Sequence, residues 1–168
     1  MNADELRAVQ APLKDRYRAD PKAALVTLIA SGALDSAIAC KVETGRALAV
    51  AGLHPATGGS GAELCSGDML LEALVACAGV TLKAVATSMG IDLRSGKVMA
   101  EGDIDFRGTL GVDKQAPVGF KAIRLAFELD TDAAQDKLDT LLRLTERYCV
   151  VYQTIKAGPP VDVKMAKV

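Results

Sequence analysis

Histidine is almost missing from this 168-residue sequence, in which His54 is the one example. Catalytic sites built from several histidines are therefore excluded. The four cysteines, Cys40, Cys65, Cys77 and Cys149, form no C-x-x-C pair, so a zinc-binding site is not expected from them either. His54 lies in the glycine-rich stretch HPATGGSG, and we interpret it as a surface loop residue rather than a catalytic base.

The sequence also lacks an excess of charge of either sign. It has 20 Lys and Arg and 21 Asp and Glu, which gives a net charge of −1. The basic residues are scattered, whereas a nucleic-acid-binding protein carries them as a patch or stripe, so no nucleic-acid partner is expected. The first twenty residues are polar and lack the apolar core of a signal peptide. We expect a cytoplasmic protein, in which cysteines are reduced unless they are catalytic or redox-sensing.

The longest apolar stretch runs from Ser66 to Gly90, and its composition predicts a buried central helix. Ser66 is a suitable N-cap, Asp68 places negative charge in the first turn, and Gly90 is a plausible stop. Apolar residues cover most faces between them, as in a helix enclosed by other elements. Asp68, Glu72 and Lys83 interrupt the run, so a membrane span is not expected.

The rest of the pattern predicts one α+β domain over residues 1–168. Residues 1–35 are expected to form an N-terminal helical arm, in which Pro12 ends a first helix and a second helix covers Pro21–Ser31. Residues 36–168 are expected to form the core. Strands are predicted over residues 36–42, 47–53, 97–110, 120–129 and 161–168, and a long helix follows a capping box at Asp132 and Gln135 and ends at Gly158.

Two cysteines, Cys77 and Cys149, fall on the two long apolar helices. If those helices pack together, the thiols could run a peroxide cycle in which a sulfenic acid on one is resolved by the other. Such a site needs a cation to offset burial of the thiolate, and Arg46, Arg107 and Arg147 are candidates. Composition and spacing alone leave a second interpretation open, in which both cysteines are structural.

The other two cysteines carry weaker signals. Cys65 lies just before the N-terminus of the central helix, a position that can lower the pKa of a thiol, so it is a second candidate for a reactive cysteine. Cys40 lies in a predicted strand and is interpreted as a small buried apolar residue.

The stretch CSGDMLLEALVACAGVTLKAVATSMGI resembles the first motif of the OsmC/Ohr family of thiol peroxidases. The stretch ERYCVVYQTI resembles the second motif of that family, with Val150 where a proline commonly follows the cysteine. The resemblance covers roughly residues 36–168. The N-terminal arm is similar to the extension found in one OsmC-like branch.

This resemblance implies roles for particular residues. Cys77 matches the peroxidatic cysteine, Cys149 the resolving cysteine, and Asp68 the acidic residue at the entrance of the helix. Arg46 is the candidate for the family arginine that pairs with the thiolate. The resemblance also implies an intertwined homodimer in which long central helices are wrapped by antiparallel-rich sheets.

The function that the resemblance implies is cysteine-based reduction of organic hydroperoxides in oxidative-stress defence. It needs no bound cofactor and no metal, only an external dithiol reductant, for which a lipoyl protein is one candidate. The alternative is a non-catalytic protein of the same fold that binds a small apolar or thiol-reactive ligand.

Overall fold

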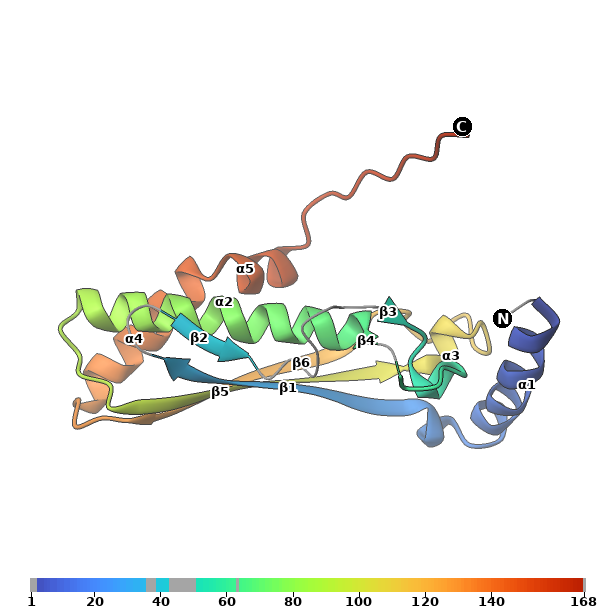
Figure 1. The fold of residues 1–168 in the computed structure, drawn as a ribbon, viewed down its shortest axis with the longest axis horizontal. Helices are drawn as coiled ribbons and strands as arrows, with labels where there is room; N and C mark the ends of the chain where they lie inside the picture. Colours follow the sequence, from blue (N-terminus) through green and yellow to red (C-terminus); the bar gives the residue numbers. More distant parts are fainter. Residues whose placement is uncertain (1–2, 36–38, 43–50, 63, 168) are drawn as a thin grey trace.

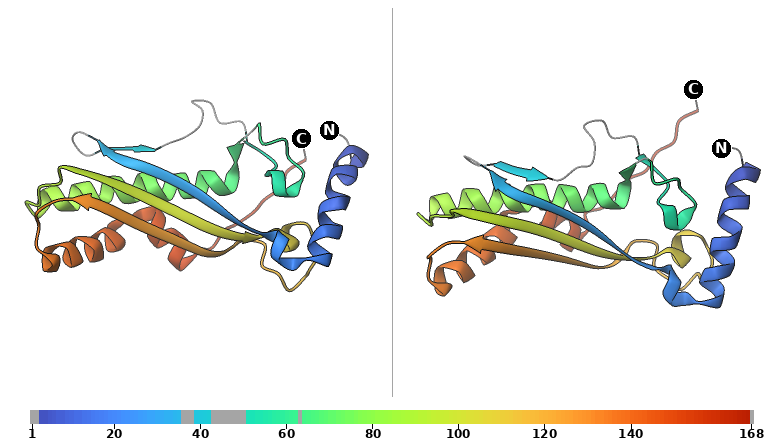
Figure 2. Two further views of the ribbon diagram at one scale, coloured as in Figure 1. Left: turned by 90° about the horizontal axis from the view of Figure 1, so that it is seen from below. Right: turned by 60° about the horizontal axis from the view of Figure 1, so that its bottom comes forward.

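The computed structural model describes residues 3–35, 39–42, 51–62 and 64–167. Its centre is an antiparallel sheet with helices on one face, as Figures 1 and 2 show, which confirms the predicted α+β class. The four strands are β1 (Leu25–Asp35), β2 (Ala39–Val42), β5 (Ser95–Asp105) and β6 (Phe120–Asp130). They lie side by side in the order β2-β1-β5-β6.

Alternation of apolar and polar residues sets the two faces of this sheet. In β5, Val98, Ala100 and Ile104 are buried, and in β6 every second side chain from Ile123 onward is half-buried. The opposite face carries charge, where Arg124 of β6 forms ion pairs with Glu101 and Asp103 of β5. The period of two predicted for residues 120–129 is therefore confirmed in β6. The strand predicted over residues 97–110 is confirmed only as far as Asp105, because a short helix follows it.

Helix α2 (Ser66–Ser88) lies along the apolar face of the sheet and confirms the predicted central helix. Leu71, Leu74, Val75 and Leu82 are almost completely buried against the core. The N-cap is Cys65 rather than the predicted Ser66, and Gly90 follows the helix with a φ of 65°, in the left-handed region that favours glycine.

The predicted long helix before Gly158 is in fact two helices, α4 (Gln135–Tyr148) and α5 (Val150–Ala157). Cys149 separates them with an extended backbone (φ −73°, ψ 107°). The capping box at Asp132 and Gln135 is wrong as well, because the N-cap is Ala134 and its side chain makes no capping hydrogen bond.

The N-terminal region differs from the predicted helical arm. Helix α1 (Ala3–Ala19) continues through Pro12, and a short 3₁₀ helix η1 (Pro21–Ala24) follows. The predicted helix over residues 21–31 is wrong beyond Ala24, because strand β1 pairs with β5 from Leu25 onward. The helical arm therefore ends at Ala24, and β1 belongs to the core sheet.

Four small elements complete the described chain: β3 (Ala51–Gly52), η2 (Pro55–Thr57), β4 (Leu64–Cys65) and α3 (Phe106–Thr109). β3 and β4 pair in parallel, and most of the predicted strand 47–53 lies outside the described residues. The predicted last strand is wrong over residues 161–167, which have no regular structure and extend away from the core in exposed positions (Figure 1).

Among the described helices, α2 is long and apolar enough, by length and composition, to cross a membrane. The sheet runs alongside it (Figure 2), so a bilayer around α2 would also enclose the ion pairs of Arg124. Charged pairs and an open sheet edge are costly in hydrocarbon. We therefore interpret α2 as a core helix, in which 39% of the most apolar window is buried within one chain.

Candidate functional site

Cys77 lies in the fourth turn of α2, where it is half-buried and packs against the core cluster that contains Cys149. The groups that act to lower the pKa of its thiol are the peptide N–H groups of Val151 and Val150, the Cys149 thiol and the Thr81 hydroxyl. The structure therefore brings together the two cysteines that sequence reasoning paired.

The break at Cys149 is what makes this arrangement possible. The first N–H groups of a helix have no partner within the helix. In α5, the N–H of Tyr152 donates to the Cys149 sulfur at 3.5 Å, and the N–H groups of Val151 and Val150 are among the groups that act to lower the pKa of Cys77. The open end of α5 thus lies beside both cysteines.

The two thiols have opposite pKa shifts. Burial acts to raise the pKa of Cys77, but the hydrogen bonds from Val151, Cys149, Val150 and Thr81 outweigh it, and the pKa falls below its ordinary value. Burial raises the pKa of Cys149 to about 11. Cys77 is therefore the more acidic thiol of the pair.

Arg46 and Asp68 are the two charged residues predicted for the site. Arg46 lies outside the described residues. Asp68 is in the first turn of α2. Its pKa is raised, because the effect of burial exceeds the lowering effect of the nearby His54. It lies nine positions before Cys77, which is roughly 13 Å along a helix axis. Within one chain, Asp68 therefore does not contact the thiol.

The other two candidate arginines have partners elsewhere. Arg107 forms an ion pair with the buried carboxylate of Asp105 at 2.6 Å and a second with Asp113 at 3.3 Å. The guanidinium of Arg147 lies over the ring of Tyr148, 5.5 Å from its centroid. Neither arginine is among the groups that shift the pKa of Cys77, which are peptide N–H groups, a thiol and a hydroxyl.

The remaining predicted candidates are placed as follows. Cys65 is half-buried at the N-cap of α2 without a capping hydrogen bond from its side chain. Cys40 is in β2, paired with Leu34. His54 caps η2, with its Nδ1 accepting from the Ala56 N–H at 3.0 Å and its ring stacked on Phe106.

Sequence reasoning missed Thr81, Val150 and Val151 as members of the site. Thr81 follows Cys77 by four residues, so the helical period places both on one face, and that signal could have been used. The two valines contribute only their peptide N–H groups. No pattern of side chains marks such donors until the helix is known to begin there.

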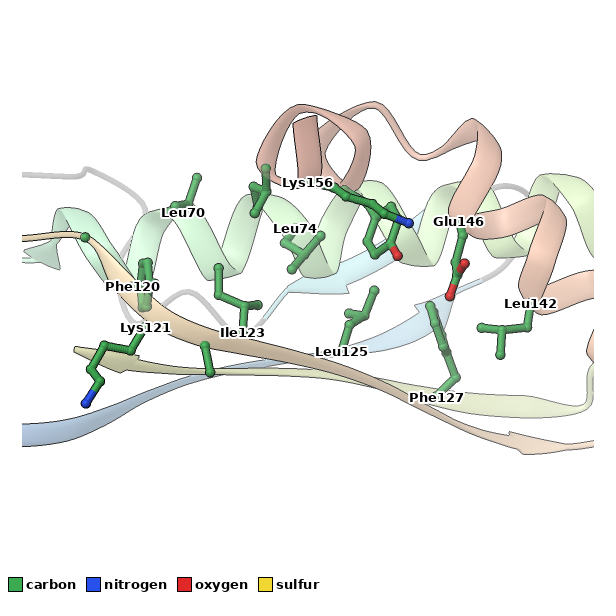
Figure 3. Close-up of a pocket in the computed structure, with 14 residues that line it drawn as sticks. Leu70, Leu74, Phe120, Lys121, Ile123, Leu125, Phe127, Leu142, Glu146 and Lys156 are labelled. Atoms are coloured by element: carbon green, nitrogen blue, oxygen red, sulfur yellow. The ribbon is translucent and has the colours of Figure 1, made fainter. Parts of the chain in front are cut away.

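A cavity of about 770 Å³ lies between α2, β6, α4 and α5 (Figure 3), and neither cysteine is among the residues that line it. Leu70 and Leu74 point into it from α2, and Ile123, Leu125 and Phe127 point into it from β6. Tyr152, one turn after Cys149, also lines it. Its walls are mainly apolar, with Lys121, Glu146 and Lys156 as the charged members.

The arrangement suits thiol chemistry. Two neighbouring thiols, of which Cys77 is the more acidic, are the parts that a two-cysteine redox cycle requires, and the helices that carry them also line an apolar cavity. Within the residues that the structure describes, no cluster of three or more His, Cys, Asp or Glu side chains could hold a metal ion.

Comparison with known proteins gives the same assignment as the motifs. The family model for OsmC-like proteins matches residues 59–164, which include both cysteines. The crystal structure of an OsmC-like hydroperoxide resistance protein from Jannaschia sp. CCS1 superposes with a TM-score of 0.63 at 12% sequence identity, over 86% of this chain and 95% of that chain. No curated protein matches the sequence. The sequence match and the shared fold together confirm the resemblance: the chain belongs to the OsmC-like protein family.

Proposed function

We propose that the protein is a thiol peroxidase that reduces organic hydroperoxides, with Cys77 as the peroxidatic cysteine and Cys149 as the resolving cysteine. The observation that carries the proposal is the packing of Cys77 of α2 against the core cluster that contains Cys149, the N-cap of α5, with the pKa of Cys77 lowered and that of Cys149 raised. The hydroperoxide resistance described for the structurally similar Jannaschia protein agrees with this activity.

The cycle follows from the two thiols. The Cys77 thiolate attacks the terminal oxygen of the hydroperoxide, the O–O bond breaks, and Cys77 becomes a sulfenic acid while an alcohol leaves. The Cys149 sulfur then attacks the Cys77 sulfur, and a disulfide forms as water is released. An external dithiol, for which a lipoyl protein is one candidate, reduces the disulfide and restores both thiols.

The apolar cavity supports organic rather than inorganic peroxides as substrates. Burial of one methylene is worth about 0.8 kcal/mol, so a few carbon atoms in contact with Leu74 and Ile123 would strengthen transition-state binding by tens to hundreds of fold. Hydrogen peroxide has no such groups. We therefore expect a higher kcat/KM for cumene or tert-butyl hydroperoxide than for hydrogen peroxide.

The deciding experiment counts free thiols and measures intact mass before and after one equivalent of cumene hydroperoxide. Two thiols and two mass units should be lost, and a dithiol should restore them. Cys77→Ser should abolish the loss, whereas Cys40→Ser should leave it unchanged. An unaltered thiol count in the parent protein would contradict the proposal.

A second candidate function rests on the same cavity. About 770 Å³ of mostly apolar space is enough for a small ligand, and such a ligand could be bound without turnover. One assay distinguishes the two functions, namely consumption of hydroperoxide in the presence of a dithiol reductant. No consumption of any hydroperoxide, together with saturable binding of an apolar probe, would favour the binding protein.

We also propose that the working unit is a homodimer. Ala73, Val80 and Thr87 form an exposed stripe along α2, and the half-buried Cys77 lies within it at the helical spacing. A second copy packed on this stripe would exclude water from the thiolate and could supply charged groups that one chain does not bring to it.

A further inference from the structure

The cavity between α2, β6, α4 and α5 has charged side chains in walls that are otherwise mainly apolar. Glu146 points from α4 toward β6, and the ammonium group of Lys156 lies at the same end of the cavity (Figure 3). The third charged residue, Lys121, points away from the cavity (Figure 3). One acidic and one basic side chain therefore stand at the same end of this apolar space.

Neither of these two charges is neutralised in the part of the chain that the structure describes. Glu146 is half-buried, and its carboxylate has no hydrogen bond or ion pair there, whereas its peptide carbonyl accepts from the Gln153 side chain at 2.7 Å. The exposed Lys156 ammonium group lies 5.4 Å from the centroid of the Tyr152 ring and has no acidic partner among the same residues. Burial of a charge without a partner is unfavourable, so a ligand that supplies opposite charges would be favoured here.

The walls and the two charges together define the chemistry of such a ligand. Leu74 of α2 is 2% exposed, and Ile123 and Phe127 line the opposite side from β6, in a volume of about 770 Å³ that is typical of small-ligand sites. A head group that is only anionic would meet Glu146, and one that is only cationic would meet Lys156. A head group that carries both charges can place each beside its opposite.

We propose that this cavity binds an amphipathic ligand whose head group carries both an ammonium and a carboxylate, as an apolar α-amino acid does. Lys156 binds the carboxylate, Glu146 binds the ammonium, and the apolar side chain of the ligand packs between α2 and β6. This inference rests on the part of the proposed function that assigns the cavity to an organic ligand, and it names the class of that ligand.

The same head group occurs in a free amino acid and in its side-chain hydroperoxide, which the proposed cycle would reduce to the hydroxy amino acid. The cavity borders the elements that hold both thiols. Leu74, which lines it, precedes Cys77 by three residues on α2, and Tyr152, which also lines it, donates its N–H to the Cys149 sulfur at 3.5 Å. The experiment therefore tests the head group first and the hydroperoxide second.

The first measurement is isothermal titration calorimetry of the reduced protein with four probes that share one alkyl chain. They are 2-aminooctanoate, octanoate, octylamine and 1-octanol, of which 1-octanol reports on the apolar walls alone. 2-Aminooctanoate should bind at least about tenfold more tightly than each of the others, because a hydrogen bond to a charged group is worth about one order of magnitude or more in affinity.

Two variants should change this order in opposite directions. Glu146→Gln should weaken the binding of 2-aminooctanoate and strengthen that of octanoate, because the repelling carboxylate is gone. Lys156→Gln should weaken the binding of 2-aminooctanoate and strengthen that of octylamine. Lys121→Gln is the matched control, which removes a charge that points away from the cavity and should leave the order as in the parent. The affinity for 1-octanol should be the same in all four proteins.

The second measurement distinguishes the free amino acid from its hydroperoxide. Single-turnover oxidation of Cys77 by leucine hydroperoxide is compared with oxidation by cumene hydroperoxide, which has no charged head group. Lys156→Gln should lower the rate with leucine hydroperoxide, relative to cumene hydroperoxide, about tenfold. An unchanged ratio, with 2-aminooctanoate still the preferred probe, would support the site and assign it to the free amino acid.

Two results would overturn the inference. Equal affinity of the parent for 2-aminooctanoate and 1-octanol would show that the charges take no part in binding. No binding of any probe would show that the cavity is filled in the assembled protein, as by a second copy of the chain. The proposed peroxidase fails separately: if no hydroperoxide oxidises Cys77 while 2-aminooctanoate remains the preferred probe, the peroxidase is contradicted and the ligand class is supported.

Discussion

At the scale of single residues, Val150 contributes to the site through its peptide N–H and not through its side chain. The side chain is 70% exposed, while the N–H is among the groups that act to lower the pKa of Cys77. The family motif commonly has proline at this position, and proline has no N–H to donate. This chain therefore has a donor to the thiolate that a proline would remove.

Val150→Pro is expected to raise the pKa of Cys77 without disturbing the fold. Position 150 is the first residue of α5, where proline is tolerated, and Cys149 before it already has the extended backbone that proline requires. Loss of a hydrogen bond to a charged group costs about 1.5–3 kcal/mol, which corresponds to about one to two pKa units.

The measurement for this change is the rate of Cys77 alkylation by iodoacetamide as a function of pH. Val150→Ala is the matched control, because it shortens the same exposed side chain and keeps the N–H. Identical pH profiles for the proline and alanine variants would show that this peptide group does not stabilise the thiolate.

The opposite pKa shifts of the two cysteines predict selective alkylation. The pKa of Cys77 is lowered, so its thiolate persists as the pH falls below the value at which an ordinary thiol, with a pKa of about 8.5, becomes protonated. The pKa of Cys149 is about 11, so it stays protonated up to that pH. At pH 7, peptide mapping should find the label on Cys77 well before Cys149, and the reverse order would contradict the assignment.

The identity of both cysteines could be predicted at this scale because each stands in its own sequence motif. The charged partners could not be established in the same way. Asp68 was chosen for its place at the entrance of the helix, but nine residues of helix keep it from Cys77 within one chain. Peptide groups are among those that act to lower the pKa of Cys77, and their presence depends on where a helix begins.

At the scale of secondary structure, the sequence predicted elements well where one face is buried and the other is charged. β6 is of this kind, whereas α2 could be predicted from a long run that is apolar on most of its faces. The region Leu25–Ser31 is mostly apolar and does not alternate with charged residues. A short apolar run of this kind does not distinguish a strand from a helix. Its pairing with β5, about seventy residues later, decides the matter.

The break between α4 and α5 could not be predicted from periodicity. Leu141, Thr145, Cys149 and Tyr152 continue one helical spacing across it, and neither glycine nor proline marks the position. The break places Cys149 where its sulfur accepts the Tyr152 N–H and its side chain lies in the core cluster against which Cys77 packs. Tertiary contacts thus override the local pattern.

The contact between β5 and the start of β6 gives an element-scale prediction. The ring of Phe120 packs directly on the backbone of Gly102, so that a methyl group at Gly102 would overlap the ring. The register of the two strands also shifts between Asp103 and Ile104. Gly102→Ala should lower the free energy of unfolding by about 1–3 kcal/mol, which is typical of overpacking.

Chemical denaturation measures this loss, and Gly119→Ala is the control because no atom lies within 4 Å of a methyl group there. Phe120→Leu in the Gly102→Ala background should recover part of the stability by removing the overlap. Equal stability of the two alanine variants would mean that the ring moves aside without cost.

At the scale of the whole molecule, one chain leaves much of its most apolar helix uncovered. Leu70 and Val80 of α2 are 40% and 39% exposed, and Leu142 and Tyr148 of α4 are 44% and 56% exposed. Exposed apolar surface of this extent usually marks an interface. A sheet already covers the opposite side of α2, so the free side is where a second copy would pack.

We therefore expect sedimentation velocity at micromolar concentration to show a species of twice the 17.5 kDa of one chain. The interface should be of the obligate type, on the order of 2,000 Å² or more.

Val80→Lys places a charge in the middle of the exposed stripe of α2, one turn from Cys77, and should shift the protein toward monomer because the buried ammonium would have no partner. Val118→Lys, on the exposed loop before β6, adds the same charge away from the stripe and should leave the dimer intact. A parent protein that sediments as a monomer would contradict the dimer, and a Val80→Lys variant that stays dimeric would place the interface on another face.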